Sequence, residues 1–183
     1  MRRQIAAALC AAALGAIASS SLATHPAAAP ARAVYSSIQE LMDSIIDPSA
    51  DVLWGAAGTV VDRDGLHDLA PKTEEEWHDV RRAAVRIIEG SNLLMMPTRE
   101  AAPRGTTSGT PGVELEPVEI AALMRKNRRT FDAFAKALQG IGSEALRAID
   151  AKNIDALMDV GARMDGVCES CHQTFWYPVR AEN

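Results

Sequence analysis

Apolar residues recur at helical spacing in four stretches of the chain. The first stretch runs from Val34 to about Ala57 and follows the i, i+3, i+4, i+7, i+8 pattern of a single helix face. The positions on this face are Ile38, Leu41, Met42, Ile45 and Ile46. Asp47-Pro48 interrupts the pattern, because a proline either kinks a helix or begins a new segment at its first turn, here with Asp47 as the cap.

The second and third helices are marked at their first residues. Thr73-Glu74-Glu75-Glu76 matches a capping box, and apolar spacing continues from there to Pro97. Its face comprises Trp77, Val80, Ala84, Ile87, Ile88, Ser91 and Leu94. Pro117 suits the first position of a third helix, which keeps helical spacing to Ile149. This helix has two predicted weak points, Gly140 and Gly142.

The fourth helix is predicted to begin at Asn153, as its cap, and to end at Pro178. Its stripe consists of Ile154, Leu157, Gly161, Met164, Cys168, Cys171 and Phe175. Four amphipathic helices bury their stripes most simply as a four-helix bundle, so the predicted fold class is all-α. No strand-like alternation competes with it.

Two connections lack any period and are rich in residues that disfavour helix. Residues 58–72 contain Gly, Asp and Pro and are predicted to form a loop. Residues 97–116 are rich in Pro, Gly and Thr and form an unusually long connection. This second connection is either a flexible bridge between helix ends or a loop on which a partner docks.

The N-terminus has the composition of a secretory signal peptide. Arg2 and Arg3 precede an almost wholly apolar run from Ile5 to Ala18, and Ala31-Arg32-Ala33 matches a small-residue cleavage site. We therefore predict a signal peptide over residues 1–33, with cleavage after Ala23 or Ala29 as alternatives, and a periplasmic domain over residues 34–183. The apolar run is short for a retained membrane anchor.

Charge and cysteine content narrow the function of the exported part. Loss of residues 1–33 removes Arg2, Arg3 and Arg32 and no acidic residue, so the net charge changes from −5 to −8. An acidic chain without clustered Lys and Arg gives no reason to expect nucleic acid as a partner. No later segment is apolar for long enough to span a bilayer. Cys10 leaves with the leader, so only Cys168 and Cys171 remain.

Cys168-Glu169-Ser170-Cys171-His172 is the Cys-x-x-Cys-His signal for c-type haem attachment. On a helix, positions i, i+3 and i+4 share a face, so both thiols can add to the vinyl groups of one porphyrin and the imidazole can reach its iron. A thioredoxin-like pair would open a helix rather than lie at its far end. A zinc site needs further Cys or His ligands at matching spacing, and a bare disulfide leaves His172 without a role.

This motif near the C-terminus of an exported four-helix chain resembles the class II c-type cytochromes, the cytochrome c-prime family. The resemblance covers the mature chain in helix order, with residues 168–172 as its only sharp motif. It implies a left-handed antiparallel bundle that holds one covalent haem c, with thioethers to Cys168 and Cys171 and with His172 as the proximal iron ligand. The first helix then lies over the opposite face of the haem.

The resemblance implies that the residue of the first helix that faces the iron distinguishes between two functions. With Met42 over the iron, the protein is expected to be a low-spin, six-coordinate one-electron carrier; with Leu41 there, the iron is five-coordinate and binds nitric oxide or carbon monoxide. Gas-binding members commonly carry a basic residue where this chain has Trp176, which favours the electron carrier. The first helix supplies no distal His or Arg, so a peroxidase-like enzyme is not expected.

The same resemblance implies periplasmic or membrane-bound redox proteins as partners, and a homodimer formed through the first two helices, with Trp54 or Trp77 on its face. The other potential iron ligands have plainer explanations. His67 and His78 are expected at the surface, and Met95, Met96 and Met124 in the core. Met164 is expected against the edge of the porphyrin.

Overall fold

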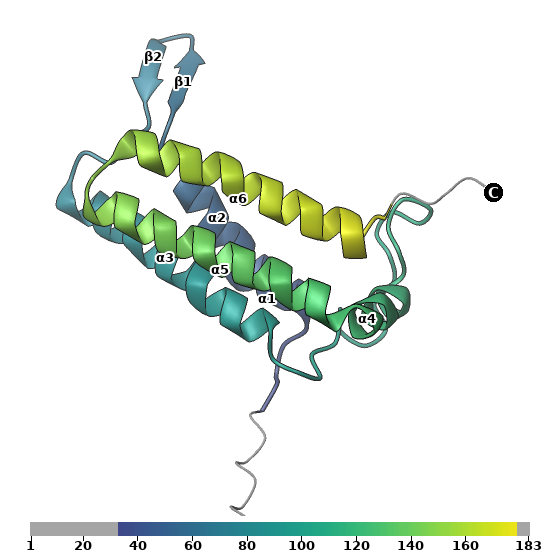
Figure 1. Cartoon of the computed structure of the whole chain (residues 1–183). Helices are drawn as coiled ribbons and strands as arrows, with labels where there is room; N and C mark the ends of the chain where they lie inside the picture. Colours follow the sequence, from purple (N-terminus) through teal and green to yellow (C-terminus); the bar gives the residue numbers. More distant parts are fainter. Residues whose placement is uncertain (1–32, 179–183) are drawn as a thin grey trace, which may run out of the picture. The chain divides into compact units, whose positions relative to one another are not determined.

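The computed structural model describes residues 33–178, which are mainly helical with one small antiparallel hairpin (Figure 1). The all-α prediction is therefore confirmed for the bulk of the chain but is wrong for the hairpin. Residues 1–32, which contain nearly all of the predicted leader, lie outside the described residues. Within residues 33–178, no helix is both long and apolar enough to cross a membrane.

The first helix begins at Ile38, with Ser37 as its cap, and is continuous to Trp54, with an irregular turn in its middle. It comprises α1 (Ile38–Leu41), the π-helical turn η1 (Met42–Ile46) and α2 (Asp47–Trp54). Ser37 and Glu40 form a capping box, which fixes the start. Asp47 has helical backbone angles, φ −60° and ψ −49°. The interpretation of Asp47 as a cap is therefore wrong, because the chain never leaves the helix there.

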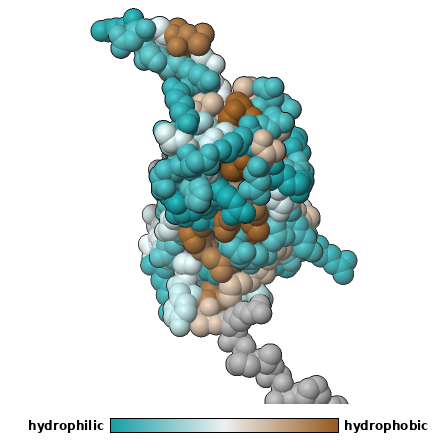
Figure 2. Space-filling model, turned by 90° about the vertical axis from the view of Figure 1, so that its left-hand side faces the viewer, coloured by the Kyte–Doolittle hydropathy of each residue, from teal (hydrophilic) through white to brown (hydrophobic). Residues whose placement is uncertain are grey.

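Residues 58–72, predicted to be a loop, contain the hairpin of β1 (Thr59–Asp62) and β2 (Gly65–Asp68). Val61 pairs with Leu66, and these two side chains are 75% and 73% exposed. Because every residue of both strands is exposed, neither face needs to be apolar, and the alternation that marks a half-buried strand is missing. Figure 2 shows the hairpin projecting from the helices, with apolar side chains on its surface.

Helix α3 (Glu74–Leu94) begins as predicted. The Thr73 side chain accepts the N–H of Glu76, and the Glu76 carboxylate accepts the N–H of Thr73, so both halves of the capping box are present. The predicted face is buried along its length, except that Ile88 is half-buried. The helix ends at Leu94, one turn before Pro97.

The predicted third helix is two helices, α4 (Pro117–Lys126) and α5 (Arg128–Asp150). The break lies at Asn127, whose backbone leaves the helical region at φ −117° and ψ 39° and whose side-chain amide donates to the Leu123 carbonyl. The glycines were the wrong choice of weak point, because α5 passes through Gly140 and Gly142 without interruption. Pro117 occupies the first turn of α4, as predicted.

The last helix, α6 (Ile154–Phe175), agrees with its prediction. The Asn153 side chain accepts the N–H of Ala156 at 3.0 Å, which confirms the cap. The predicted stripe is buried or half-buried along the helix. The helix ends at Phe175, three residues before Pro178.

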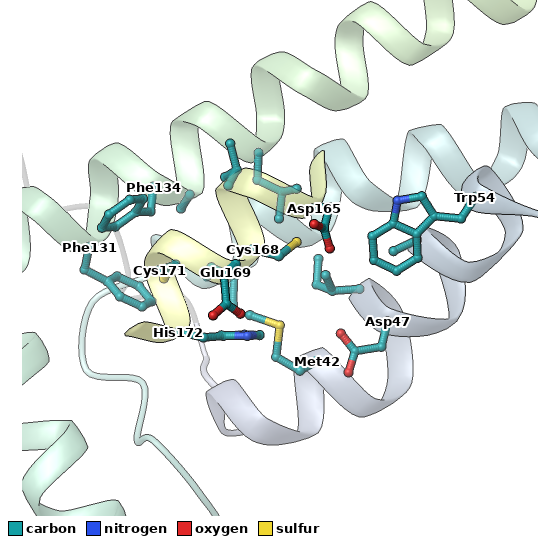
Figure 3. A pocket seen from close by; sticks show the side chains of 16 residues that line it. Met42, Asp47, Trp54, Phe131, Phe134, Asp165, Cys168, Glu169, Cys171 and His172 are labelled. Atoms are coloured by element: carbon teal, nitrogen blue, oxygen red, sulfur yellow. The ribbon is translucent and has the colours of Figure 1, made fainter. Parts of the chain in front are cut away.

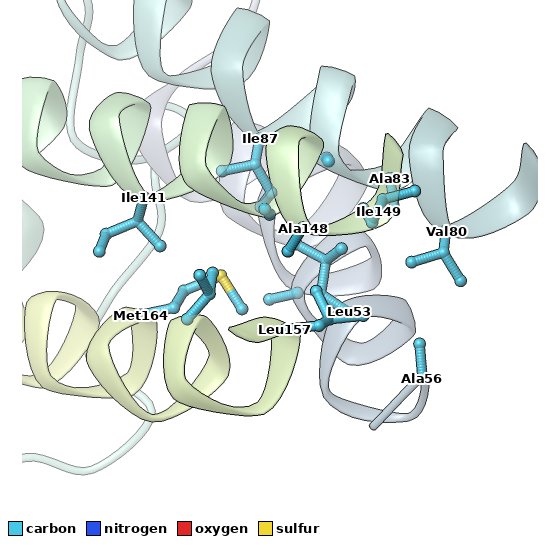
Figure 4. Close-up of a cluster of buried hydrophobic side chains, with 14 of the residues drawn as sticks. Leu53, Ala56, Val80, Ala83, Ile87, Ile141, Ala148, Ile149, Leu157 and Met164 are labelled. Atoms are coloured by element: carbon cyan, nitrogen blue, oxygen red, sulfur yellow. The ribbon is translucent and has the colours of Figure 1, made fainter. Parts of the chain in front are cut away.

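The main core lies where α2, α3, α5 and α6 pack side by side (Figure 4). Helix α3 packs against α2 and α5, and α6 packs against α5 and α2, so each of the four touches two others. Ala83, Ala84, Ile87 and Ala145 are wholly buried there. Trp77 also belongs to this core and is not available as a surface for association.

The long connection between α3 and α4 packs against the start of the first helix. The Ile38 N–H donates to the Glu100 carbonyl at 2.9 Å, and the Gln39 N–H donates to the Ala101 carbonyl at 3.0 Å. Arg99 is only 9% exposed, and its guanidinium donates to the Leu93 carbonyl at 3.0 Å and to Ser36. These contacts hold the N-terminal turn of the helix that carries Met42.

Candidate cofactor-binding site

Two adjoining cavities of about 220 and 270 Å³ lie where the C-terminal half of α6 faces the first helix. Both are lined mainly by apolar side chains. Five residues line both cavities: Met42, Asp47, Phe131, Cys171 and His172. Cys168 lines the first cavity (Figure 3). The four candidate haem-binding residues predicted from the sequence therefore lie together at one place: Met42, Cys168, Cys171 and His172.

The two thiols are half-buried on the inner face of α6. Cys168 packs against the main core and Cys171 against a second apolar cluster that includes Leu41, Phe131 and Phe175. Burial, reinforced by nearby Asp47 and Asp165, raises the pKa of Cys168 to about 11, and burial raises the pKa of Cys171 to about 12. This apolar setting is opposite to that of a redox-active dithiol, which needs a stabilised thiolate.

His172 lies in the last turn of α6, where the helix end holds its backbone. The His172 carbonyl accepts the N–H groups of Trp176 at 2.7 Å and of Tyr177 at 3.0 Å. The Tyr177 ring lies beside the imidazole, with 6.1 Å between ring centroids. The Tyr177 hydroxyl in turn donates to Glu169 at 2.7 Å, and this bond raises the pKa of Tyr177 to about 12 and lowers the pKa of Glu169.

Met42 comes from the π-helical turn, on the opposite side of the cavities from His172. Its thioether points into the space between the two helices, towards the imidazole (Figure 3). Leu41, the neighbouring candidate, is 3% exposed, belongs to the second apolar cluster and lines neither cavity. Of these two residues, only Met42 lines the cavities that Cys168 and Cys171 also line.

Aromatic side chains form the wall beneath the thiols. Phe131 and Phe134 from α5 each make an edge-to-face contact with Phe175, at centroid distances of 5.5 and 6.3 Å. Trp54 lines the first cavity, and its indole N–H donates to the Gly161 carbonyl at 3.1 Å. In the sequence, Phe131 and Phe134 are two apolar positions within the predicted third helix. Their role depends on which helices become neighbours, which no local pattern reveals.

Carboxylates occur around both cavities, whereas no Lys or Arg of residues 33–178 lines either one. Asp47, Asp165 and Glu169 line the first cavity, and Asp43, Asp47 and Glu114 line the second. Partial burial raises the pKa of the Asp47 carboxyl, an effect that the nearby His172 opposes. Nothing in the local pattern around Asp47-Pro48 distinguishes a carboxylate that lines a cavity from a helix cap.

The other residues considered as ligands or contacts lie elsewhere or serve the core. His67 and His78 are exposed, on β2 and α3. Met124 is buried and lines the second cavity, while Met95 and Met96 are half-buried. Met164, expected against a porphyrin edge, is wholly buried in the main core and lines neither cavity.

Comparisons with protein-family models, with curated proteins and with solved structures found no significant match.

Proposed function

We propose that this chain is an exported c-type cytochrome that carries one electron at a time. In this proposal the helices form an antiparallel four-helix bundle of the class II type, resembling the cytochrome c-prime family. One haem c is attached through Cys168 and Cys171, and its iron is ligated by His172 and Met42. The partners are periplasmic or membrane-bound redox proteins, and the signal peptide over residues 1–33 takes the chain to the periplasm.

One observation carries the proposal: two thiols, an imidazole and a thioether line the same pair of adjoining, mainly apolar cavities. This donor set fits a c-type haem, because the thiols match the vinyl groups and the other two groups are the His/Met ligands of electron-transfer haems. The donors come from helices far apart in the sequence, at Met42 and at residues 168–172. Their meeting is a property of the fold rather than of the motif alone.

The surrounding residues have defined tasks. A bound haem supplies a one-electron ferric–ferrous couple. The Phe131, Phe134 and Phe175 cluster gives the cavities a rigid apolar wall, which excludes water and so lowers the local dielectric. Two hydrogen bonds accepted by the His172 carbonyl, together with the neighbouring Tyr177 ring, limit the movement of the imidazole. A rigid ligand cage suits electron transfer, because little has to reorganise.

The placement of Met42 favours electron transfer over gas binding. A thioether ligand closes the sixth coordination position and raises the reduction potential. The alternative, a five-coordinate protein that binds nitric oxide or carbon monoxide, requires Leu41 to crowd the iron. Leu41 is packed in the second apolar cluster and lines neither cavity, so the structure offers that alternative no support.

To test the proposal, the chain is produced in cells that contain the haem-attachment machinery, and the mass and the optical spectrum of the purified protein are measured. We expect a mass increase of one haem, lost in the double variant Cys168→Ala/Cys171→Ala, and a weak long-wavelength ferric band typical of Met–iron bonding. Met42→Ala should abolish this band, whereas the control Met158→Ala, at a methionine 49% exposed on α6, should keep it.

Two results would contradict the proposal. A mature protein whose mass equals that of the bare polypeptide removes the cofactor altogether. A high-spin ferric spectrum that Met42→Ala leaves unchanged, together with rapid binding of carbon monoxide by the ferrous protein, instead establishes the five-coordinate alternative.

A further inference from the structure

The π-helical turn η1 changes the register of the first helix just where Met42 lies. The N–H of Asp47 donates to the carbonyl of Met42, five residues back, instead of the four of an α-helix. The turn therefore holds one additional residue. Within it, residues five apart share a face, whereas in an α-helix residues four apart do so.

This register decides which side chain faces the cavities. Leu41 is aligned with Ile46, and the two are buried, at 3% and 2% exposure; Ile46 borders only the first cavity, and Leu41 borders neither. Met42 is aligned with Asp47, and these two line both cavities. In an uninterrupted α-helix, Met42 would instead align with the buried Ile46, and Asp43 would align with Asp47. A carboxylate would then occupy the place of the thioether.

Pro48 provides the physical cause of the additional residue. Proline has no N–H to give to the carbonyl of Ser44, four residues back, and its ring would collide with that carbonyl in a regular helix. A wider turn moves the carbonyl aside. The Ser49 hydroxyl donates to the Ile45 carbonyl at 2.6 Å, which provides a partner for one carbonyl of the disturbed ladder, and Ser49 is only 1% exposed.

The C-terminal side of the turn is held by α3. A Cβ atom at Gly90 would overlap the Cδ1 atom of Ile46 and would lie 3.3 Å from Ile45 Cγ2, so the backbone of α3 and the turn are in close contact here. Because Ile46 is fixed in this way, a change in helix winding has to rotate the segment that precedes it, which carries Leu41 and Met42.

We propose that Pro48 is the positioning residue that turns Met42 towards His172, by imposing the π-helical turn. The inference rests on the proposed function, in which Met42 is an iron ligand. Pro48 itself lines neither cavity and acts only through the winding of the helix. With the π-helical turn that Pro48 imposes, the thioether of Met42 faces His172; in a regular helix, the carboxylate of Asp43 would take that position.

The first experiment replaces Pro48 and reads the ligation of the iron. In Pro48→Ala holoprotein, residue 48 regains an N–H, the helix can close as a regular α-helix, and the Met–iron band should be lost with a fall in reduction potential. Pro117→Ala is the matched control, because Pro117 also occupies the first turn of a helix but no π-helical turn precedes it. The control should keep the spectrum and the potential.

The second experiment restores the register without the proline. Deletion of the exposed Ser44 in the Pro48→Ala background leaves an uninterrupted helix in which Leu41 lies four residues before Ile46 and Met42 four before Asp47. The alignment of the natural turn returns, so the Met–iron band should return. Loss of the band in Pro48→Ala without its recovery in the deletion variant would show general loosening of the helix and would overturn the inference.

A third measurement does not depend on the haem. In the haem-free full-length chain, peroxide oxidation of Met42, followed by mass spectrometry with the exposed Met158 as an internal reference, should become several-fold slower in Pro48→Ala, because Met42 moves to the buried face. An unchanged oxidation rate overturns the inference, whatever becomes of the haem. Absence of haem from the natural protein contradicts the proposed function alone and leaves this measurement decisive.

Discussion

At the scale of single residues, the candidate site depends on keeping two thiols neutral in an apolar wall. Burial raises the pKa of Cys168 to about 11 and the pKa of Cys171 to about 12, above the usual value of a cysteine. The folded haem-free protein thus binds these protons more tightly than the unfolded chain does. Such thiols are expected to react slowly with oxidants in the haem-free chain.

We therefore predict slow, strongly pH-dependent alkylation of both cysteines in the haem-free chain. A pKa raised to about 11 leaves Cys168 with roughly a hundredfold less thiolate than an unperturbed cysteine has at the same pH, and a pKa raised to about 12 leaves Cys171 with roughly a thousandfold less. Labelling with iodoacetamide, followed site by site by mass spectrometry, should give half-maximal rates above pH 10. The unfolded chain in denaturant is the control and should react with a midpoint near pH 8.5. A folded midpoint below pH 9 contradicts the prediction.

The same protons link the stability of the haem-free chain to pH. Above about pH 9, the unfolded state has lost the thiol protons that the folded state still holds, so unfolding releases protons and the free energy of unfolding falls as pH rises. Below that value both states are protonated and these groups contribute no slope. Replacement of both cysteines by Ala should flatten this dependence between pH 9 and 11, as measured by urea titration.

Arg99 is the residue that ties the long connection to the helix carrying Met42. Its burial lowers its pKa, and its guanidinium bonds to the Leu93 carbonyl and to Ser36. Arg99→Ala should lower the free energy of unfolding by about 2 kcal/mol, because it leaves these oxygens without a charged donor. Arg104→Ala, at an exposed arginine of the same connection, is the control and should change little. Equal effects of the two changes on the urea midpoint would refute this role.

At the scale of elements, the two glycines of α5 have opposite roles. A Cβ at Gly142 would lie 2.9 Å from Ile88 Cγ1 and 3.0 Å from Ile87 Cγ2, whereas a Cβ at Gly140 meets nothing within 4 Å. Gly140→Ala should stabilise the protein by about 0.5–1 kcal/mol through helix propensity alone. Gly142→Ala should destabilise it by about 1 kcal/mol, because overpacking outweighs the same gain. Thermal unfolding that ranks the two variants in the reverse order would disprove the contact.

Local signals predicted helix beginnings well, because the chemistry of a cap lies within a few residues. Thr73 with Glu76, and Asn153, all bond the backbone as expected. The break at Asn127 was missed because it does not disturb the apolar period on either side. The π-helical turn was missed for a similar reason: the stripe from Ile38 to Ile46 looks the same in the sequence whether or not one additional residue is wound into the turn.

The candidate site was predictable only where its parts share one helix. The spacing of Cys168, Cys171 and His172 determines by itself that they face one way. Met42 was placed opposite them by resemblance to a family, not by any pattern in this chain. The aromatic wall and Asp47 come from helices distant in the sequence, and only the packing of α5 and α2 against α6 brings them to the cavities.

At the scale of the whole molecule, the two ends of the helix assembly differ in how completely their side chains are packed. The main core around Ile87 and Ala145 is closed, with both residues wholly buried. The second cluster, around Leu41, Phe131 and Phe175, adjoins the cavities, whose walls lack packing partners on one side. The hairpin lies at the opposite end of α6 from α4 (Figure 1). The protein is thus well packed at one end and incompletely packed at the end that carries the candidate site.

This asymmetry predicts how hydrogen exchange is distributed in the haem-free chain. Amides of α3 and α5 near Ala84 and Ala145 should be protected close to the global stability, while those of residues 38–46 and 168–175 should open at lower cost, because fewer apolar contacts hold them. If haem attaches as proposed, it would fill the cavities, and protection should rise chiefly in these two segments. Exchange followed by mass spectrometry with and without haem tests this. A uniform rise over all helices would mean that the cavities do not limit local stability.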